Sequence, residues 1–243
     1  MNKGGANIAA AIEQAEGLAI AAYLTAGFPS VRTFLEAASQ LSREADVVEI
    51  GIPFSDPIAD GPTIQRASAA ALAGGVRLED ALAAALRVSS NAPAVLMSYL
   101  NPILARGVVR FAELAAAAKV AGVIIPDLPL EESTEIELIM NGFDIALIQL
   151  VSPITPQLRV QRICQQTDGF VYAVATTGVT GGTTVTNTRL IEYLDRVRSV
   201  AVTPVMAGFG IRTASQAAAL SAHVDGIVVG SALVEVLEQD DDP

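Results

Sequence analysis

Short apolar runs rich in β-branched residues alternate along the whole chain with segments of helical character. Turn residues bound these runs, as expected of buried strands, at 18–24, 47–51, 94–99, 122–125, 145–151, 170–175, 204–207 and 226–229. The segments between them indicate helices at 31–45, 78–89, 109–120, 130–141, 157–166, 188–197 and 213–222. Strands that alternate with helices form parallel βαβ units. Eight strand candidates favour an α/β fold of the (β/α)8 TIM-barrel type over an open doubly wound sheet.

The organisation of the chain indicates one domain. No linker rich in proline, glycine or serine and no charge run divides the 243 residues. Barrels of this class commonly have this length, so we expect a single barrel domain over residues 1–243. A short helical segment at 231–238 and an acidic tail follow the last strand candidate.

Composition argues against several classes of function. The net charge of −11 disfavours nucleic acid as a partner, because phosphate-backbone binding needs a basic surface. No apolar run reaches the roughly 18 residues of a membrane span, and the first residues lack a signal-peptide core. Cys164, as the one cysteine, cannot form an intrachain disulfide or a cysteine-rich zinc site, so we expect no metal. We interpret His223 as a surface loop residue and expect a cytoplasmic protein.

Residues 47–65 carry two carboxylates in contrasting surroundings, in the sequence VVEIGIPFSDPIADGPTIQ. Glu49 ends a strand candidate, Asp60 lies in the following turn region, and Pro62 opens a helix. In parallel α/β proteins the carboxyl ends of the strands carry the chemistry. Burial should keep Glu49 protonated while Asp60 stays ionised, a division typical of acid and electrostatic roles. The alternatives are an arginine-paired structural carboxylate for Glu49 and turn formation for Asp60.

Glycine-containing segments follow the last three strand candidates, at 178–182, 208–212 and 230–231. Barrel phosphate sites form from the loops after strands seven and eight and the start of a short extra helix. Glycine allows close backbone approach, and a helix N-terminus offers free N–H groups and a positive dipole end. The pattern therefore predicts a phosphate site built from backbone groups, although each glycine alone is equally compatible with a turn.

Residues 47–65 closely resemble the signature segment of the tryptophan synthase α-subunit family, E-[LIV]-G-[IV]-P-[FY]-S-D-P-x-A-D-G-P-x-I-Q, at every fixed position. The resemblance extends over about residues 18–237. It implies a lyase of tryptophan biosynthesis that cleaves indole-3-glycerol phosphate by a retro-aldol reaction to indole and glyceraldehyde 3-phosphate. In this reaction Glu49 would be the acid and base, and Asp60 would accept a hydrogen bond from the indole N–H.

The resemblance also implies substrate-binding residues. Tyr172 would position the glycerol hydroxyl or Glu49, and Thr180, eight residues later, would contact Asp60 from a mobile loop. Phosphate contacts would come from Gly181, Gly210, Gly230 and Ser231. The indole pocket would be lined by Tyr23, Tyr99, Ile124, Leu150 and Phe209. Apolar and aromatic residues at strand ends are equally compatible with plain core packing.

The resemblance further implies a β subunit as partner, in an α2β2 tetramer. The cofactor pyridoxal phosphate (PLP) would belong to that partner, since neither Lys3 nor Lys119 resembles a PLP lysine. Two features depart from the family: the final barrel helix is missing after the 231–238 segment, and 182–184 lack the charged residues often found there. A stand-alone indole-3-glycerol phosphate lyase and a non-catalytic regulatory subunit of a β subunit remain alternatives.

Overall fold

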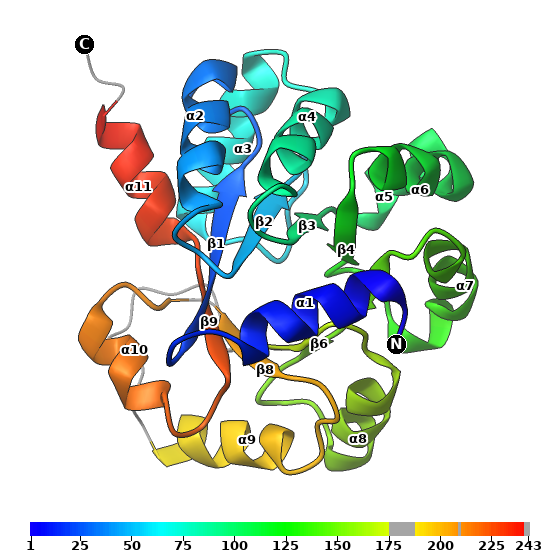
Figure 1. Cartoon of the computed structure of the whole chain (residues 1–243), viewed down its shortest axis with the longest axis vertical. Coiled ribbons are helices and arrows are strands. Elements are labelled where there is room, and N and C mark those ends of the chain that lie inside the picture. The colour runs from blue at the N-terminus through cyan, green and yellow to red at the C-terminus, as the bar shows by residue number, and fades with distance from the viewer. Residues whose placement is uncertain (175–187, 209, 241–243) are drawn as a thin grey trace.

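Parallel strands form a cylinder that is wrapped by helices (Figure 1). The computed structural model describes residues 1–174, 188–208 and 210–240. Its strands are β1 Ala19–Thr25, β2 Val47–Gly51, β3 Ala94–Met97, β4 Val120–Ile124, β5 Ala146–Ile148, β6 Leu150–Val151, β7 Val171–Val174, β8 Val205–Gly208 and β9 Gly226–Val229. Their order around the cylinder is β5-β4-β3-β2-β1-β9-β8-β7-β6.

The two edge strands of this sheet, β5 and β6, are consecutive in the chain and separated only by Gln149. The Gln149 N–H donates to Thr167 Oγ1 at 2.9 Å, and its carbonyl accepts from the Tyr172 N–H at 3.0 Å. The predicted strand at 145–151 is thus divided, with β5 pairing to β4 and β6 pairing to β7. The two halves serve as one barrel strand, and the predicted TIM barrel is confirmed.

Helices follow nearly every strand on the outside of the cylinder. They are α2 Val31–Leu41, α3 Pro62–Ala73, α4 Leu78–Val88, α5 Leu100–Arg106, α6 Val108–Ala117, η1 Leu130–Glu132, α7 Thr134–Gly142, α8 Gln157–Gln166, α9 Thr188–Arg198, α10 Ala214–Leu220 and α11 Ser231–Asp240. The short α5 was not predicted from the sequence, and α2 ends at Leu41 rather than at residue 45.

A further helix that was not predicted, α1 Lys3–Glu13, covers the amino end of the barrel. The Asn2 side chain caps it by accepting a hydrogen bond from the Gly5 N–H at 2.9 Å. A Cβ atom on Gly4 would collide with carbonyl oxygens at the starts of β4 and β5, so glycine is needed for this close approach. Ile8 and Ile12 are buried in the barrel interior, which is therefore closed by apolar side chains at this end.

Inward and outward side chains alternate along the strands, as strand geometry requires. On β2, Val47 belongs to the interior cluster, whereas Val48 and Ile50 pack outward beneath the helices. A second outer cluster lies under α8, α9 and α10. Glu49 therefore occupies an inward position in an otherwise apolar stretch, which places a carboxyl group inside the barrel.

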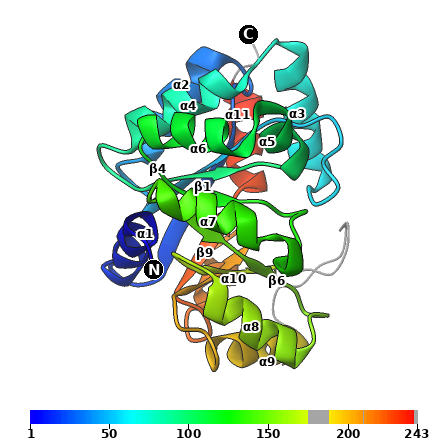
Figure 2. The ribbon, with the colours of Figure 1, turned by 90° about the vertical axis from the view of Figure 1, so that its right-hand side faces the viewer.

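The last described element, α11, packs against α3 and β1 (Figure 2). Val234 on α11 is 1% exposed and joins the interior cluster. Ile20, on the outer side of β1, is 41% exposed in the described part of the chain. Among the described residues, no helix has the length and apolar character needed to cross a membrane.

Candidate active site

A cavity at the carboxyl ends of the strands brings together residues from five strands, three connecting segments and two helices. It is lined by Tyr23, Glu49, Asp60, Ile64, Met97, Tyr172, Gly210, Ile211, Val228, Gly230 and Ser231. Both carboxylates predicted from the sequence lie here with two of the predicted tyrosines and three of the predicted phosphate residues. Ile64, Met97, Ile211 and Val228 were not predicted as site residues. The alternation that puts Val95 inside the barrel was the signal for Met97, two residues further along β3.

Glu49 is 1% exposed, and neither of its carboxyl oxygens has a hydrogen-bond partner among the described residues. Burial, followed by the negative charge of Asp60, raises the pKa of Glu49 from 4.5 to about 8. Glu49 is thus mostly protonated at neutral pH and able to donate a proton. The alternative of an arginine-paired structural carboxylate is wrong, because no arginine of the described residues contacts it.

Asp60 is 8% exposed and is fixed through its backbone. Its N–H donates to the Pro57 carbonyl at 3.3 Å, and its own carbonyl accepts from Gln65 Nε2 at 2.9 Å. Burial raises the pKa of Asp60 from 3.8 to about 6, and a hydrogen bond from Tyr99 opposes this rise. Asp60 is therefore mostly ionised at neutral pH, as expected, and beside Glu49 it forms a pair with divided protonation states.

Tyr99 holds the loop that carries Asp60. Its phenolic oxygen accepts a hydrogen bond from the Ala59 N–H at 2.9 Å, and its hydroxyl is hydrogen-bonded to the Asp60 carboxylate. Its ring stacks on Phe54, at the other end of the same loop, with 5.2 Å between the centroids. The resemblance assigned Tyr99 to the indole pocket. The structure places it against the loop and not among the residues that line the cavity.

The phenols of Tyr23 and Tyr172 lie in the cavity, and each one occupies space that a glycine on a neighbouring strand leaves free. Tyr23 is paired with Glu49 across β1 and β2, and a Cβ atom on Gly51 would collide with the Tyr23 hydroxyl. Likewise, a Cβ atom on Gly208 would collide with the tip of the Tyr172 ring. Burial raises the pKa of both phenols well above its usual value. Both therefore stay neutral beside the carboxylates.

Backbone groups dominate the side of the cavity that faces α11. Gly210 has a φ of +84°, a conformation that side chains disfavour. Gly230 precedes α11, and Ser231 begins it. The first N–H groups of a helix have no partner within the helix and carry its positive dipole end. This part of the cavity is therefore suited to an anion, although the chain as a whole is acidic.

The remaining predicted site residues lie elsewhere. Thr180, Gly181 and Phe209 fall outside the described residues, as does the predicted mobile loop at 178–182. Ile124 is buried in the interior cluster and Leu150 packs against it, but neither lines the cavity. Among the described residues, no group of three or more histidine, cysteine, aspartate or glutamate side chains is placed to hold a metal ion.

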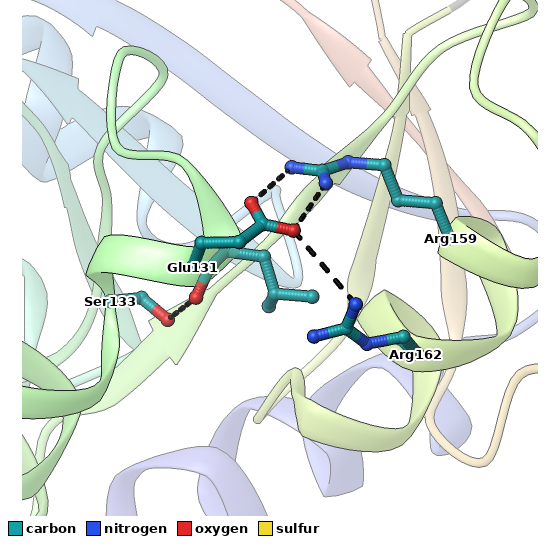
Figure 3. A network of polar contacts seen from close by, with 5 residues as sticks. Glu131, Ser133, Arg159 and Arg162 are labelled. Atoms are coloured by element: carbon teal, nitrogen blue, oxygen red, sulfur yellow. Dashed lines mark hydrogen bonds and ion pairs between the residues drawn. The ribbon is translucent and has the colours of Figure 1, made fainter.

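An ion-pair network joins the segment after β4 to the helix after β6 (Figure 3). Glu131, in η1 after β4, accepts two hydrogen bonds from the Arg159 guanidinium of α8, at 2.5 and 2.8 Å. Arg162 lies 3.9 Å from the same carboxylate. Arg159 holds the pKa of Glu131 at about 2. The network links η1 to α8, and exposed pairs of this kind contribute little to stability.

Comparison with known proteins gives one consistent result. The family model described as tryptophan synthase alpha chain matches residues 9–243. The tryptophan synthase alpha chain of Carboxydothermus hydrogenoformans is 46% identical over 223 residues, which are 90% of this chain and 84% of that protein. That of Xanthomonas axonopodis pv. citri is 45% identical over 229 residues, 92% and 85% of the two chains.

Solved structures agree with the sequence comparisons. A tryptophan synthase structure from Mycobacterium tuberculosis superposes with a TM-score of 0.89 and 38% identity, over 98% of this chain and 92% of that one. The tryptophan synthase α2β2 complex of Pyrococcus furiosus gives a TM-score of 0.85 and 35% identity, over 92% and 91%. The family model, the relatives and these structures lead to the same conclusion: the chain belongs to the tryptophan synthase alpha chain family.

Proposed function

We propose that this chain cleaves indole-3-glycerol phosphate by a retro-aldol reaction to indole and glyceraldehyde 3-phosphate, with Glu49 and Asp60 as catalytic residues. One observation carries the proposal: a buried, protonated carboxyl group and an ionised carboxylate line the same cavity as a glycine-rich anion site. Family membership supports a lyase role in tryptophan synthesis. The specific reaction is the one that the resemblance implies, and the chemistry of this pair of carboxyl groups supports it.

The reaction needs a proton donor first and a proton acceptor second. The Glu49 carboxyl protonates C3 of the indole, which removes the aromaticity that protects the carbon–carbon bond. The ionised Asp60 accepts a hydrogen bond from the indole N–H and stabilises the positive charge that develops on the ring. The Glu49 carboxylate then takes the proton of the glycerol hydroxyl as the carbon–carbon bond breaks. This step yields the aldehyde and returns the bonding electrons to the indole, so Glu49 ends protonated again.

Binding groups complete the proposed site. The phosphate ester lies against Gly210, Gly230 and Ser231 at the N-terminus of α11, with Gly181 as a fourth contact. Tyr172 is a hydrogen-bonding group for the glycerol hydroxyl, and Tyr23 forms a wall for the indole. Tyr99, Ile124 and Leu150 do not line the cavity and are not assigned to the indole pocket. Phe209 is kept as a pocket residue and Thr180 as a contact of Asp60, as the resemblance implies.

We also propose a β subunit as partner in an α2β2 assembly, with PLP held by that partner. The support is the similarity to the Pyrococcus furiosus chain, which belongs to an α2β2 complex whose two parts activate each other. The loop at residues 53–61 carries Asp60 and includes Ile58, which is 81% exposed. A partner that orders this loop would act directly on a catalytic residue.

Indole release from indole-3-glycerol phosphate, measured for this chain alone and with an added β subunit, tests the proposal. Slow release that a β subunit accelerates strongly is the expected result. Fast release that a β subunit does not change would indicate a stand-alone lyase. If no indole is released in either case while β-subunit activity changes, the chain is a regulatory subunit and the proposed reaction is wrong.

A further inference from the structure

Glu235, in the second turn of α11, contacts two segments that flank the cavity. Its Oε1 accepts a hydrogen bond from Thr63 Oγ1 at 3.1 Å, and its Oε2 forms an ion pair with the Arg212 guanidinium. Thr63 lies in the first turn of α3, three residues after Asp60. Arg212 lies two residues after Gly210. One carboxylate therefore joins the Asp60 segment to the segment of the anion site.

These contacts lie immediately behind the wall of the cavity. Ile64 and Ile211, the chain neighbours of Thr63 and Arg212, both line it. Glu235 itself sits one turn after Ser231, whose helix start forms the anion side of the same cavity. A shift of either segment must therefore change the position of its partner or break a contact with Glu235.

The contacts of Glu235 differ from a second contact between α3 and α11. Arg66 on α3 and Glu238 on α11 lie 3.5 Å apart, with side chains 57% and 45% exposed, which is an ordinary surface pair. The Glu235 side chain is 31% exposed and uses one oxygen for each partner. The hydrogen bond from Arg212 and then that from Thr63 lower the pKa of Glu235. This carboxylate is therefore charged whenever the protein is near neutral pH.

The backbone of Arg212 is also fixed, because its N–H donates to Gln216 Oε1 at 2.8 Å. A phosphate group bound at Gly210 attracts the Arg212 guanidinium and the N-terminus of α11. Both of these elements reach the Thr63 side chain through Glu235. The geometry thus offers a short route from the anion site to the catalytic loop.

We propose that Glu235 is a positioning residue that couples phosphate binding at Gly210 to the placement of Asp60, through Arg212 on one side and Thr63 on the other. This inference rests on the proposed function, because it assigns Gly210 to phosphate and Asp60 to the reaction. Substrate that is correctly bound through its phosphate thereby stabilises the loop that carries the acceptor for the indole N–H.

A double-mutant cycle between the two partners tests the coupling. Thr63→Val removes a hydroxyl at constant shape, and Arg212→Met removes the charge but keeps the stem. In the native background we expect the loss of kcat/KM in the double variant to differ by about threefold or more from the product of the two single losses, as is typical of residues in one network. In a Glu235→Ala background we expect the loss in the double variant to equal the product of the single losses. Glu235→Gln, which still accepts a hydrogen bond from Thr63, should retain more coupling than Glu235→Ala.

The affinity for inorganic phosphate gives a second test, because a purely structural role of Glu235 would not change how Thr63 affects it. Thr63→Val should weaken the binding of inorganic phosphate about threefold, although Thr63 lies on the Asp60 side, and this effect should vanish in Glu235→Ala. Glu238→Gln breaks the surface pair between the same two helices and is the matched control, with unchanged phosphate affinity and kcat. Circular dichroism of each variant establishes that it is folded.

The outcomes separate this inference from the proposed function. If the native chain binds phosphate but releases no indole, the proposed reaction fails, and the response of phosphate affinity to Thr63→Val alone decides the coupling. If the native chain is active, losses that multiply in both backgrounds, with unchanged phosphate affinity in Thr63→Val, overturn the inference. A native chain that neither binds phosphate nor releases indole overturns both.

Discussion

The Ala59 N–H donates a hydrogen bond of 2.9 Å to the phenolic oxygen of Tyr99, which ties the loop after β2 to the end of β3. The same phenol is hydrogen-bonded to the carboxylate of Asp60 and lowers its pKa. The position and the acidity of Asp60 thus both depend on a residue from another strand. Such a contact links loop geometry to catalysis without any contact between Tyr99 and the cavity.

We expect Tyr99→Phe to lower kcat by about 10-fold, because a hydrogen bond to a charged group contributes about 1.5–3 kcal/mol. The ring, and with it the contact to Phe54, is retained. Loss of the phenol raises the pKa of Asp60, so the acidic limb of the pH profile should move to higher pH. Tyr193→Phe is the control, since it loses a 2.9 Å hydrogen bond to the Val151 carbonyl outside the cavity and should keep its kcat. An unchanged kcat and pH profile in Tyr99→Phe would contradict the role assigned to this phenol.

The pH dependence of kcat/KM should be bell-shaped. Activity needs Asp60 ionised, so it falls as the pH drops through about 6, and it needs Glu49 protonated, so it falls as the pH rises through about 8. The two carboxyl groups influence each other, so the limbs report the pair. Asp60→Asn should abolish the limb near 6 in whatever activity remains. A profile that is flat between about 5 and about 9 would remove both groups from the mechanism.

Glu49→Gln should lower kcat by roughly 10²–10⁴-fold through loss of the general acid and base. It should also change how the free energy of unfolding depends on pH. The pKa of Glu49 is raised on folding, from 4.5 to about 8, so the folded state binds more protons than the unfolded state across this range. The free energy of unfolding therefore falls as the pH rises, by at most about 1.4 kcal/mol per pH unit.

Glu49→Gln cannot ionise and should lack this loss. Its stability relative to the native chain should therefore increase as the pH rises from about 4.5 to about 8. Urea unfolding of both proteins at several pH values across this range measures the difference. A constant difference would mean that Glu49 keeps an ordinary pKa in the folded protein.

The barrel was predictable because its signal is local. Each strand is a short apolar run with turn residues on both sides, and parallel strands joined by helices leave few possible topologies. The division of the fifth strand at Gln149 was not predictable, since it results from hydrogen bonds to Thr167 and Tyr172 that come from distant sequence. The helix α1 escaped prediction because Gly4 and Gly5 in its first turn weaken helix propensity.

The part of the candidate site that lies within one sequence motif was predictable. Glu49 and Asp60 belong to one contiguous run, and the structure places both in one cavity. The contacts made by Tyr99 were not foreseen, because a strand-end tyrosine gives no sign of which loop its hydroxyl meets. The contact of Glu235 with Thr63 joins residues 172 positions apart, and no local pattern reports it.

Gly210→Val should raise KM with little change in kcat, because it places a side chain where the phosphate contacts the backbone. The φ of +84° at Gly210 also makes any side chain there strained. Gly75 separates the two effects, since its φ is +79° and a Cβ atom there meets nothing within 4 Å. Gly75→Val should therefore destabilise the fold to a similar degree and leave KM unchanged. Equal KM values for the two variants would show that Gly210 does not contact the phosphate, and a higher KM for Gly210→Val alone would place the phosphate against Gly210.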